Sequence, residues 1–252
     1  MTALIIAAGK GDRLKSRHHV KPLLRLLGVP LIEHVMAQAG KGGVTDFVVV
    51  TGYHSEEVRQ RLDDFALRTR TQIRQVANEE WEKPNGLSVL AARGQLDAPF
   101  FLLMSDHLFD PTILRDLATS SFDPLGVTLA VDFDLQNPTV DLGDVTRVQC
   151  DGSRIRGLGK GLTPFNGYDT GIFYCSPALF DAIDESVRTH GDASLSGGMN
   201  VLAALEKAHA YDVSGRFWLD VDDPRSADLA AEMLQTGSAG VIRDTASTRT
   251  YQ

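Results

Sequence analysis

The sequence predicts an α/β fold built around one mixed and mostly parallel β-sheet. Apolar runs of strand length alternate with segments whose apolar residues recur at helical spacing, the pattern of parallel strands joined by crossover helices. After Asp132 this alternation weakens, and a polar loop and an Asp-Gly turn signal indicate a hairpin that mixes the sheet. With 252 residues the chain can bury one large core, so we expect one domain over residues 1–235 and a flexible C-terminal tail over 236–252.

The first eighty residues predict three buried strands and two helices. The strands are expected over 4–6, 46–51 and 73–77. The helices are expected over 30–39 and 55–62, the second capped by Ser55. Because each strand ends in polar or glycine residues, the carboxyl edge of this sheet is the expected ligand side.

The rest of the chain predicts a less regular order of elements. Asn85-Gly86 opens a helix, and apolar strands are expected over 100–104 and 126–131. A hairpin is expected over 145–149 and 154–158, joined by an Asp-Gly turn. Further elements are a strand over 168–175 followed by a helix, a helix over 195–207, a strand-like segment over 216–222, and a last helix that begins at Asp223-Pro224.

Composition excludes several classes of protein. The formal net charge of -8 and a sequence pI of about 5.3 argue against general binding of nucleic acid, which needs a broad basic surface. No apolar run reaches the roughly 20 residues of a membrane span, and the chain enters a strand at once, where a signal peptide would stand. Two cysteines form neither a disulfide framework nor a zinc site, so we expect a reduced, cytoplasmic protein.

A basic, glycine-rich loop after the first strand is the clearest functional signal. Gly9 and Gly11 can turn their amides toward an anion, because glycine tolerates positive φ. A single acid, Asp12, stands here among the basic residues Lys10, Arg13, Lys15, Arg17, Lys21 and Arg25. The loop is therefore expected to bind phosphate groups.

Two well-known phosphate loops do not fit. The P-loop string of glycine, four residues and Gly-Lys-Ser/Thr is absent. A dinucleotide fingerprint needs a third glycine where Leu14 stands, and an acid where the second strand ends in Thr51-Gly52. A dehydrogenase-type dinucleotide binder is thus disfavoured.

Carboxylates follow two further segments of the sheet. Asp106 ends the apolar strand over 100–104, where an unpaired buried carboxylate would be costly, so a cation is the expected partner. Capping of the next helix is the alternative role, but Asp110 is better placed for it. Asp220 and Asp222 form a second acidic group, and the pattern does not distinguish them, because alternate residues of a strand share a face. Oxygen ligands of this kind suit Mg²⁺.

The loop resembles the signature of the sugar-phosphate nucleotidyltransferases, through Ala7-Ala8-Gly9-x-Gly11-x-Arg13-Leu14 and the later Lys21-Pro22-Leu23. A closer resemblance, to the CTP:inositol-1-phosphate cytidylyltransferases, rests on the stretches 85–90, 104–107, 159–160, 169–173 and 216–222 and spans about residues 2 to 234. The resemblance implies a Rossmann-like, three-layer nucleotidyltransferase fold. It also implies Mg²⁺-dependent transfer of CMP from CTP to inositol 1-phosphate, giving CDP-inositol and pyrophosphate.

The resemblance also implies roles for individual residues. Nucleotide binding is expected of Ala7, Ala8, Gly9, Lys10, Gly11, Thr51, Asn85, Gly86 and Ser88. Catalysis is expected of Lys21, Arg13 and Asp106, and acceptor binding of His107, Lys160, Asp169 and Thr170. The metal ligands are expected among Asp106, Asp220 and Asp222.

Two other readings stay open at this point. The acceptor could be another phosphorylated molecule, such as a sugar phosphate, choline phosphate or a phosphonate, because few polar contacts set such specificity. The domain could instead sense nucleotide without turnover, although Lys21 and the full set of metal carboxylates argue against it. The partners are then small molecules. Use of the product by a separate membrane synthase and assembly as a homodimer are left open.

Overall fold

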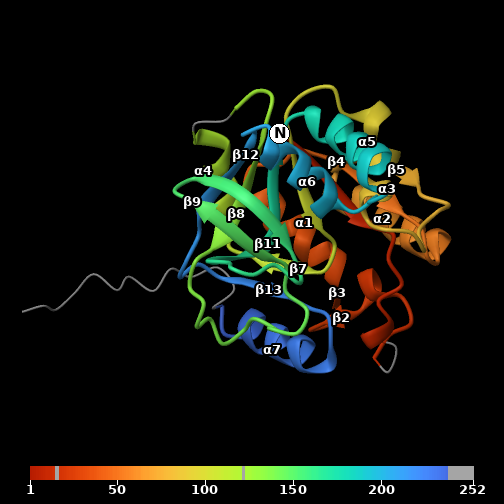
Figure 1. Ribbon diagram of the computed structural model, residues 1–252. Helices are drawn as coiled ribbons and strands as arrows, with labels where there is room; N and C mark the ends of the chain where they lie inside the picture. Colours follow the sequence, from red (N-terminus) through yellow and green to blue (C-terminus); the bar gives the residue numbers. More distant parts are fainter. Residues whose placement is uncertain (15–16, 121–122, 238–252) are drawn as a thin grey trace, which may run out of the picture.

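The computed structural model describes residues 1–14, 17–120 and 123–237, and the expected tail lies outside these ranges except for its first two residues. Nine strands form one sheet in the order β5-β4-β1-β6-β11-β8-β12-β10-β9 (Figure 1). Their bounds are β1 Thr2–Ala7, β4 Asp46–Thr51, β5 Gln72–Ala77, β6 Phe100–Met104, β8 Val127–Asp132, β9 Arg147–Asp151, β10 Arg154–Gly159, β11 Gly167–Cys175 and β12 Ala208–Asp212.

The sheet is mixed, as the sequence predicts. Strands β5, β4, β1 and β6 run parallel to one another, whereas β11 lies antiparallel between β6 and β8. Strand β12 is parallel to β8, and β10 reverses direction again beside β9. The hairpin predicted around Asp151-Gly152 is thus confirmed, with Gly152 at φ +57° in its turn.

Helices cover both faces of the sheet and make three layers. The helices are α1 Leu31–Lys41, α2 Ser55–Thr69, α3 Gly86–Ala91, α4 Thr112–Thr119, α5 Ala178–His190, α6 Leu195–Ala204 and α7 Pro224–Gln235. Apolar residues of α1, α2 and α4 share one core with alternate residues of the strands, and those of α3, α5 and α6 share the other. Ile5 faces the first core and Leu4 the second, which explains why β1 is apolar throughout.

Short elements complete the structure and bring the site together. They are the 3₁₀ helices η1 Asp12–Leu14, η2 Lys21–Leu23 and η3 Arg93–Gln95, and the short strands β2 Arg25–Leu26, β3 Val29–Pro30, β7 His107–Phe109 and β13 Trp218–Asp220. Strands β7 and β13 pair antiparallel, with His107 opposite Asp220. This pairing joins the end of β6 to the segment before α7, and Figure 1 shows the two short strands between the main sheet and α7.

Some helices begin or end differently from what the sequence predicts. Ser55 is the first residue of α2 and does not cap it, because His54 precedes it in the left-handed conformation at φ 49°. Helix α6 ends at Ala204, before the expected 207, since Glu206 also adopts positive φ and turns the chain into β12. Strands β12 and β7 lack a long apolar run and were not expected. Among the described residues, no helix has both the length and the apolar character needed to cross a bilayer.

Candidate active site

The two signature glycines serve different purposes. At Gly9 an added Cβ would meet no atom within 4 Å, so the backbone there is open to a ligand. At Gly11, which has φ +65°, an added Cβ would lie 2.4 Å from Cβ of Lys21. Gly11 therefore leaves room for the lysine side chain, and β1 delivers Gly9 to the sheet edge where ligands bind.

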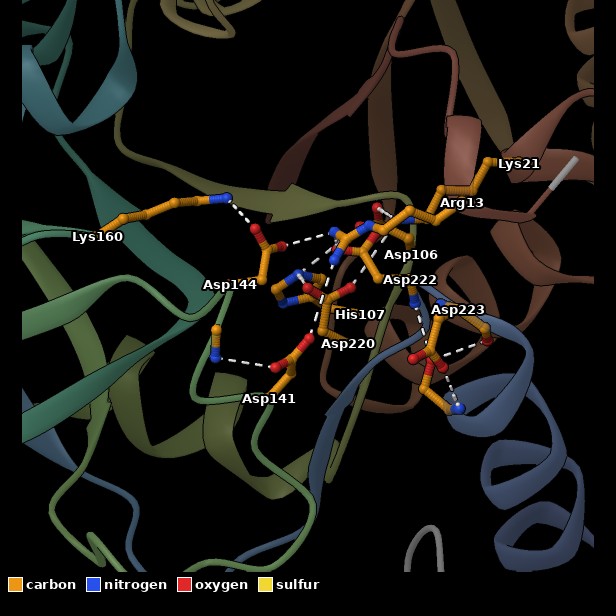
Figure 2. A network of polar contacts seen from close by, with 12 residues as sticks. Arg13, Lys21, Asp106, His107, Asp141, Asp144, Lys160, Asp220, Asp222 and Asp223 are labelled. Atoms are coloured by element: carbon orange, nitrogen blue, oxygen red, sulfur yellow. Dashed lines mark hydrogen bonds and ion pairs between the residues drawn. The ribbon is translucent and has the colours of Figure 1, made fainter.

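Lys21 lies at the centre of an acidic cluster formed by Asp106, Asp220 and Asp222. Its side chain is only 8% exposed, and its Nζ lies 2.5 Å from Oδ2 of Asp106. The same ammonium group hydrogen-bonds Oδ1 of Asp222 and lies 3.9 Å from Oδ1 of Asp220. The structure thus brings together Lys21 and all three carboxylates that the sequence singles out (Figure 2).

Asp144 contacts two basic residues, Arg13 and Lys160, that are expected to bind different substrates. Its Oδ2 accepts a hydrogen bond of 2.6 Å from Arg13, and its Oδ1 accepts one from Lys160 (Figure 2). Burial alone would raise the pKa of Asp144, but the hydrogen bonds from Lys160 and Arg13 lower it overall. Arg13 also bonds Asp222, so it connects the acidic cluster to Asp144. Asp144 was not expected at the site, because nothing in the local sequence separates it from other acids of its loop.

His107 lies within the acidic cluster. Its Nδ1 donates to the carbonyl oxygen of Thr170 at 2.8 Å, and its Nε2 lies 3.4 Å from Asp220 and 3.7 Å from Asp106. Burial alone would lower the pKa of His107, but the two carboxylates raise it to about 9. Gly171, at φ +75°, makes room for the ring, since an added Cβ would lie 2.3 Å from Nδ1. His107 is therefore a cation that orients Asp220 and Asp106.

The acidic cluster suits a divalent cation. Oδ1 of Asp220 is buried and makes no hydrogen bond within the described structure. Burial alone would raise the pKa of Asp220, but His107, Lys21 and Arg13 lower it to about 2, so it is ionised. Asp220 and Asp222 place carboxylate oxygens within 4.8 Å of each other and of an oxygen of the adjoining Asp144, and an oxygen of Asp220 also lies within that distance of one of Asp106. An all-oxygen set with one unsatisfied buried atom fits Mg²⁺.

A pocket of about 660 Å³ lies beside this cluster and is walled by the loop between β8 and β9. The loop is held by Asp132, which is 1% exposed. Asp132 accepts hydrogen bonds from Asn137 of the loop at 2.8 Å and from the indole of Trp218 at 2.9 Å. His107, Lys160 and Asp169 also line the pocket, which places three of the four expected acceptor residues there. Burial raises the pKa of Asp169 to about 6.

Two of the residues expected to bind substrate, Thr170 and Thr51, have hydroxyl groups that face carbonyl groups of neighbouring strands. Thr170 is fully buried, and its hydroxyl donates to the carbonyl of Ala130 on the neighbouring strand at 2.8 Å. Thr51 is also fully buried, with its hydroxyl toward the carbonyl of Val76. Both threonines lie in central strands, where a hydroxyl is satisfied by the next strand. The carbonyl of Thr170 faces the site and accepts a hydrogen bond from His107.

The residues expected near the nucleobase lie close to the pocket, but they also make hydrogen bonds or packing contacts within the protein. Asn85 lines the pocket, and its Oδ1 accepts a hydrogen bond from the backbone of Leu195. An added Cβ at Gly86 would lie 2.3 Å from the carbonyl oxygen of Ala193, so Gly86 is needed for packing. Ser88 is buried and accepts a hydrogen bond from Asn78. Of the three, Asn85 has the side chain placed to meet a ligand.

Ala7 and Ala8 are buried at the end of β1, and Lys10 is half-buried beside the Tyr53 ring, 5.7 Å from its centroid. Ala8 is also fixed by its carbonyl, which accepts a hydrogen bond from the backbone of Tyr53. Small side chains and a satisfied backbone at this point keep the strand end flat. The flat surface leads to the open backbone at Gly9.

Residues 3–142 match the family model described as MobA-like NTP transferase domain. Two curated relatives are named bifunctional IPC transferase and DIPP synthase. The one from Aquifex aeolicus is 29% identical over 95% of this chain, and the one from Rubrobacter xylanophilus is 32% identical over 92%. The chain spans about half of each relative, 53% and 51%. A solved structure, the inositol-1-phosphate CTP transferase from T. maritima, shares the fold with a TM-score of 0.83 and 23% identity, covering 96% of this chain and 97% of its own.

Proposed function

Because the chain belongs to the family of MobA-like NTP transferase domains, we propose that it transfers CMP from CTP to inositol 1-phosphate, giving CDP-inositol and pyrophosphate. The observation that carries the chemistry is the convergence of Arg13, Lys21 and Lys160 on one set of carboxylates beside the pocket. The choice of CTP and inositol 1-phosphate is supported by the names of the relatives and of the structural neighbour.

The nucleotide lies, in this proposal, over the open backbone of Gly9. Amides of the signature loop and the side chains of Lys10 and Arg13 bind the triphosphate, as expected for a glycine-rich loop with clustered cations. Asn85 meets the base edge from the other side of the pocket. Arg13 must exchange Asp144 for phosphate oxygens when the nucleotide binds.

The acceptor occupies the pocket beside Asp169 and Lys160. Lys160 binds its phosphate, and Asp169 accepts hydrogen bonds from its hydroxyl groups. An oxygen of this phosphate attacks the α-phosphorus, the bond to the β-phosphate bridging oxygen breaks, and pyrophosphate leaves with the electron pair. No general base is needed, because a phosphate monoester is already ionised near neutral pH.

Charge neutralisation and alignment then supply most of the catalysis. Lys21 stabilises the charge that develops at the α-phosphate, and its low exposure keeps that interaction away from water. His107 holds Asp106 and Asp220 in place as a neighbouring cation. Asp106, with Asp220 or Asp222, would hold Mg²⁺, which neutralises phosphate charge when bound.

The proposal extends to the setting of the reaction. The curated relatives carry a second named activity, DIPP synthase. We infer that a membrane synthase of that kind consumes the product and that this domain acts on small molecules in the cytoplasm.

Pyrophosphate release tests the proposal. The protein is incubated with Mg²⁺ and each of the common nucleoside triphosphates, crossed with inositol 1-phosphate, choline phosphate, glucose 1-phosphate and a phosphonate. Release with CTP and inositol 1-phosphate, lost in Asp106→Asn and retained in the exposed-surface control Asp184→Asn, is the expected result.

Release with a different pair would overturn the substrate assignment and move the specificity argument to Asn85, Lys160 and Asp169. Nucleotide binding without release for any pair would overturn the enzymatic assignment and favour a nucleotide-sensing domain.

A further inference from the structure

Two histidines and a glutamate form a second cluster of ligand atoms on the outer side of the signature loop. His19 lies in the segment that leads to Lys21, whereas His54 and Glu57 lie at the start of α2. Nδ1 of His54 lies 2.5 Å from Oε1 of Glu57, and Nε2 of His19 lies 3.4 Å from Oε2. One ligand atom from each residue lies within 4.8 Å of the other two. None of the three has a role in the proposed reaction.

The rings of this cluster are held by packing. His19 stacks on His18, with centroids 4.9 Å apart, and meets the edge of His54 at 5.1 Å. His18 is itself fixed, because its Nδ1 accepts a hydrogen bond from the backbone of Val20 at 3.0 Å. The ring of His54 also contacts that of Tyr53, at 4.4 Å.

The backbone of His54 adds a second constraint. At φ 49° and ψ 41° it lies in the left-handed region, which a non-glycine residue adopts only where the surroundings hold it. Neighbouring backbone bonds, from Tyr53 to Ala8 and from Ser55 to Gly52, fix this turn. This turn places His54 three residues before Glu57, and the imidazole lies against the Glu57 carboxylate.

The ligand types select a particular class of cation. Imidazole nitrogens with one carboxylate suit Zn²⁺ and its neighbours in the transition series, whereas Mg²⁺ prefers oxygen ligands alone. The side chains are 57%, 38% and 47% exposed, which leaves a coordination position for water.

We propose that His19, His54 and Glu57 form a binding site for a divalent transition-metal ion of the Zn²⁺ class, separate from the acidic cluster around Lys21. The ion replaces the proton that His54 shares with Glu57, and bonds to Nε2 of His19, Nδ1 of His54 and one carboxylate oxygen. Binding ties the segment before Lys21 to the start of α2. This site does not depend on the proposed transferase activity.

Zinc titration calorimetry on the full chain tests the proposal, with excess Mg²⁺ present to occupy the acidic cluster. Wild type is expected to bind one Zn²⁺ here, and His19→Ala, His54→Asn and Glu57→Gln to weaken binding at least about tenfold, since even outer-shell changes cost roughly 10–100-fold. His54→Asn is chosen because asparagine tolerates the left-handed conformation. His190→Ala, which removes an exposed imidazole on α5, is the matched control and is expected to keep wild-type affinity.

A titration in a second variant distinguishes zinc binding at this site from zinc binding at the acidic cluster. His107 and Asp220 could also take zinc, so the titration is repeated in Asp220→Asn, where the equivalent that depends on His19 is expected to remain. Thermal melting without metal checks that each variant is folded. If the folded double variant His19→Ala/His54→Asn still bound this Zn²⁺ ion with wild-type affinity, the assignment would be overturned. Equal weakening by His190→Ala, or no zinc binding by wild type, would also overturn it.

Discussion

Nζ of Lys21 lies 2.5 Å from Oδ2 of Asp106, so an ammonium group neutralises a carboxylate that is expected to hold the metal. The same nitrogen bonds Asp222. In the metal-free protein the lysine therefore stands where a divalent cation would also be attracted. We therefore expect metal and lysine to compete for the same oxygens until substrate phosphate gives the lysine another partner.

Lys21→Met separates these two effects. Turnover is expected to fall by about 10²–10³-fold, the usual loss when one group that stabilises transition-state charge is removed. Binding of Mg²⁺ to the free protein is expected to tighten, because the competing charge is gone. Steady-state kinetics and Mg²⁺ calorimetry measure the two quantities. Weaker Mg²⁺ binding in this variant would show that Lys21 organises the carboxylates and does not compete for them.

Asp106→Asn is expected to abolish Mg²⁺-dependent turnover, with a loss of about 10²-fold or more, while the protein stays folded. The side chain is only partly buried, and its amide replacement keeps the shape. Circular dichroism checks the fold, and pyrophosphate release checks turnover across a range of Mg²⁺ concentrations. Wild-type turnover at any Mg²⁺ concentration would remove Asp106 from the metal site.

Asp144→Asn is expected to strengthen CTP binding in the absence of Mg²⁺, by about two- to tenfold. Asp144 bonds Arg13 and Lys160 in the free protein, and a negative charge near these cations repels phosphate. Fluorescence or calorimetric titration in EDTA measures the change. The matched variant Asp134→Asn alters an acid of the same loop that bonds only backbone in the described contacts. A loss of affinity in Asp144→Asn would mean that it positions the two cations for the substrate.

His107 predicts a pH dependence of stability in the metal-free protein. Its pKa is about 9 in the folded state, above the 6.5 of an unfolded histidine. The stabilisation is therefore complete below pH 6.5 and is lost as the pH rises from 6.5 to 9, by about 3 kcal/mol.

Urea unfolding at pH 6.5 and at pH 9, in EDTA, measures this dependence. His107→Gln is expected to remove most of the decline. Asp169, with a pKa of about 6, titrates below this window and does not contribute to it. An unchanged decline in the variant would assign the dependence to other groups.

The glycine pair predicts two distinct defects. Gly11→Ala places a methyl group 2.4 Å from Cβ of Lys21 at a positive φ, so it is expected to lower stability by about 1–3 kcal/mol and also reduce turnover. Gly9→Ala meets open space, so it is expected to keep stability while raising the KM for CTP. Urea unfolding and kinetics are compared for both. A stable Gly11→Ala protein, or an unchanged KM in Gly9→Ala, would contradict the respective assignment.

The local parts of the site were predictable, because their signals lie within short stretches. The signature loop, the strand that ends at Asp106 and the helix that starts at Asp223 each combine a motif with a clear change of hydropathy. Lys21 follows from the same motif. Its partners at Asp220 and Asp222 required the resemblance as well, because periodicity alone does not place β13 beside β7.

The parts that escaped prediction depend on contacts between distant segments. Asp144 reaches Arg13 only because the loop after β8 folds over the sheet edge, and one acid among several in a polar loop carries no local signal. Thr51 and Thr170 carry hydroxyl groups that suit a ligand, yet central strands direct them to neighbouring carbonyls. Sequence patterns give the residue and the element, but not the register that decides which way a side chain points.

The two hydrogen bonds that Asp132 accepts affect how such a site can change its substrate during evolution. One buried carboxylate fastens the pocket wall, through Asn137, to the indole of Trp218, and Trp218 begins the strand that carries Asp220. Side chains of the loop between these hydrogen bonds can therefore change while the residues proposed to bind phosphate and metal keep their positions. Selection for another acceptor can act on the wall alone and leave the transfer chemistry intact.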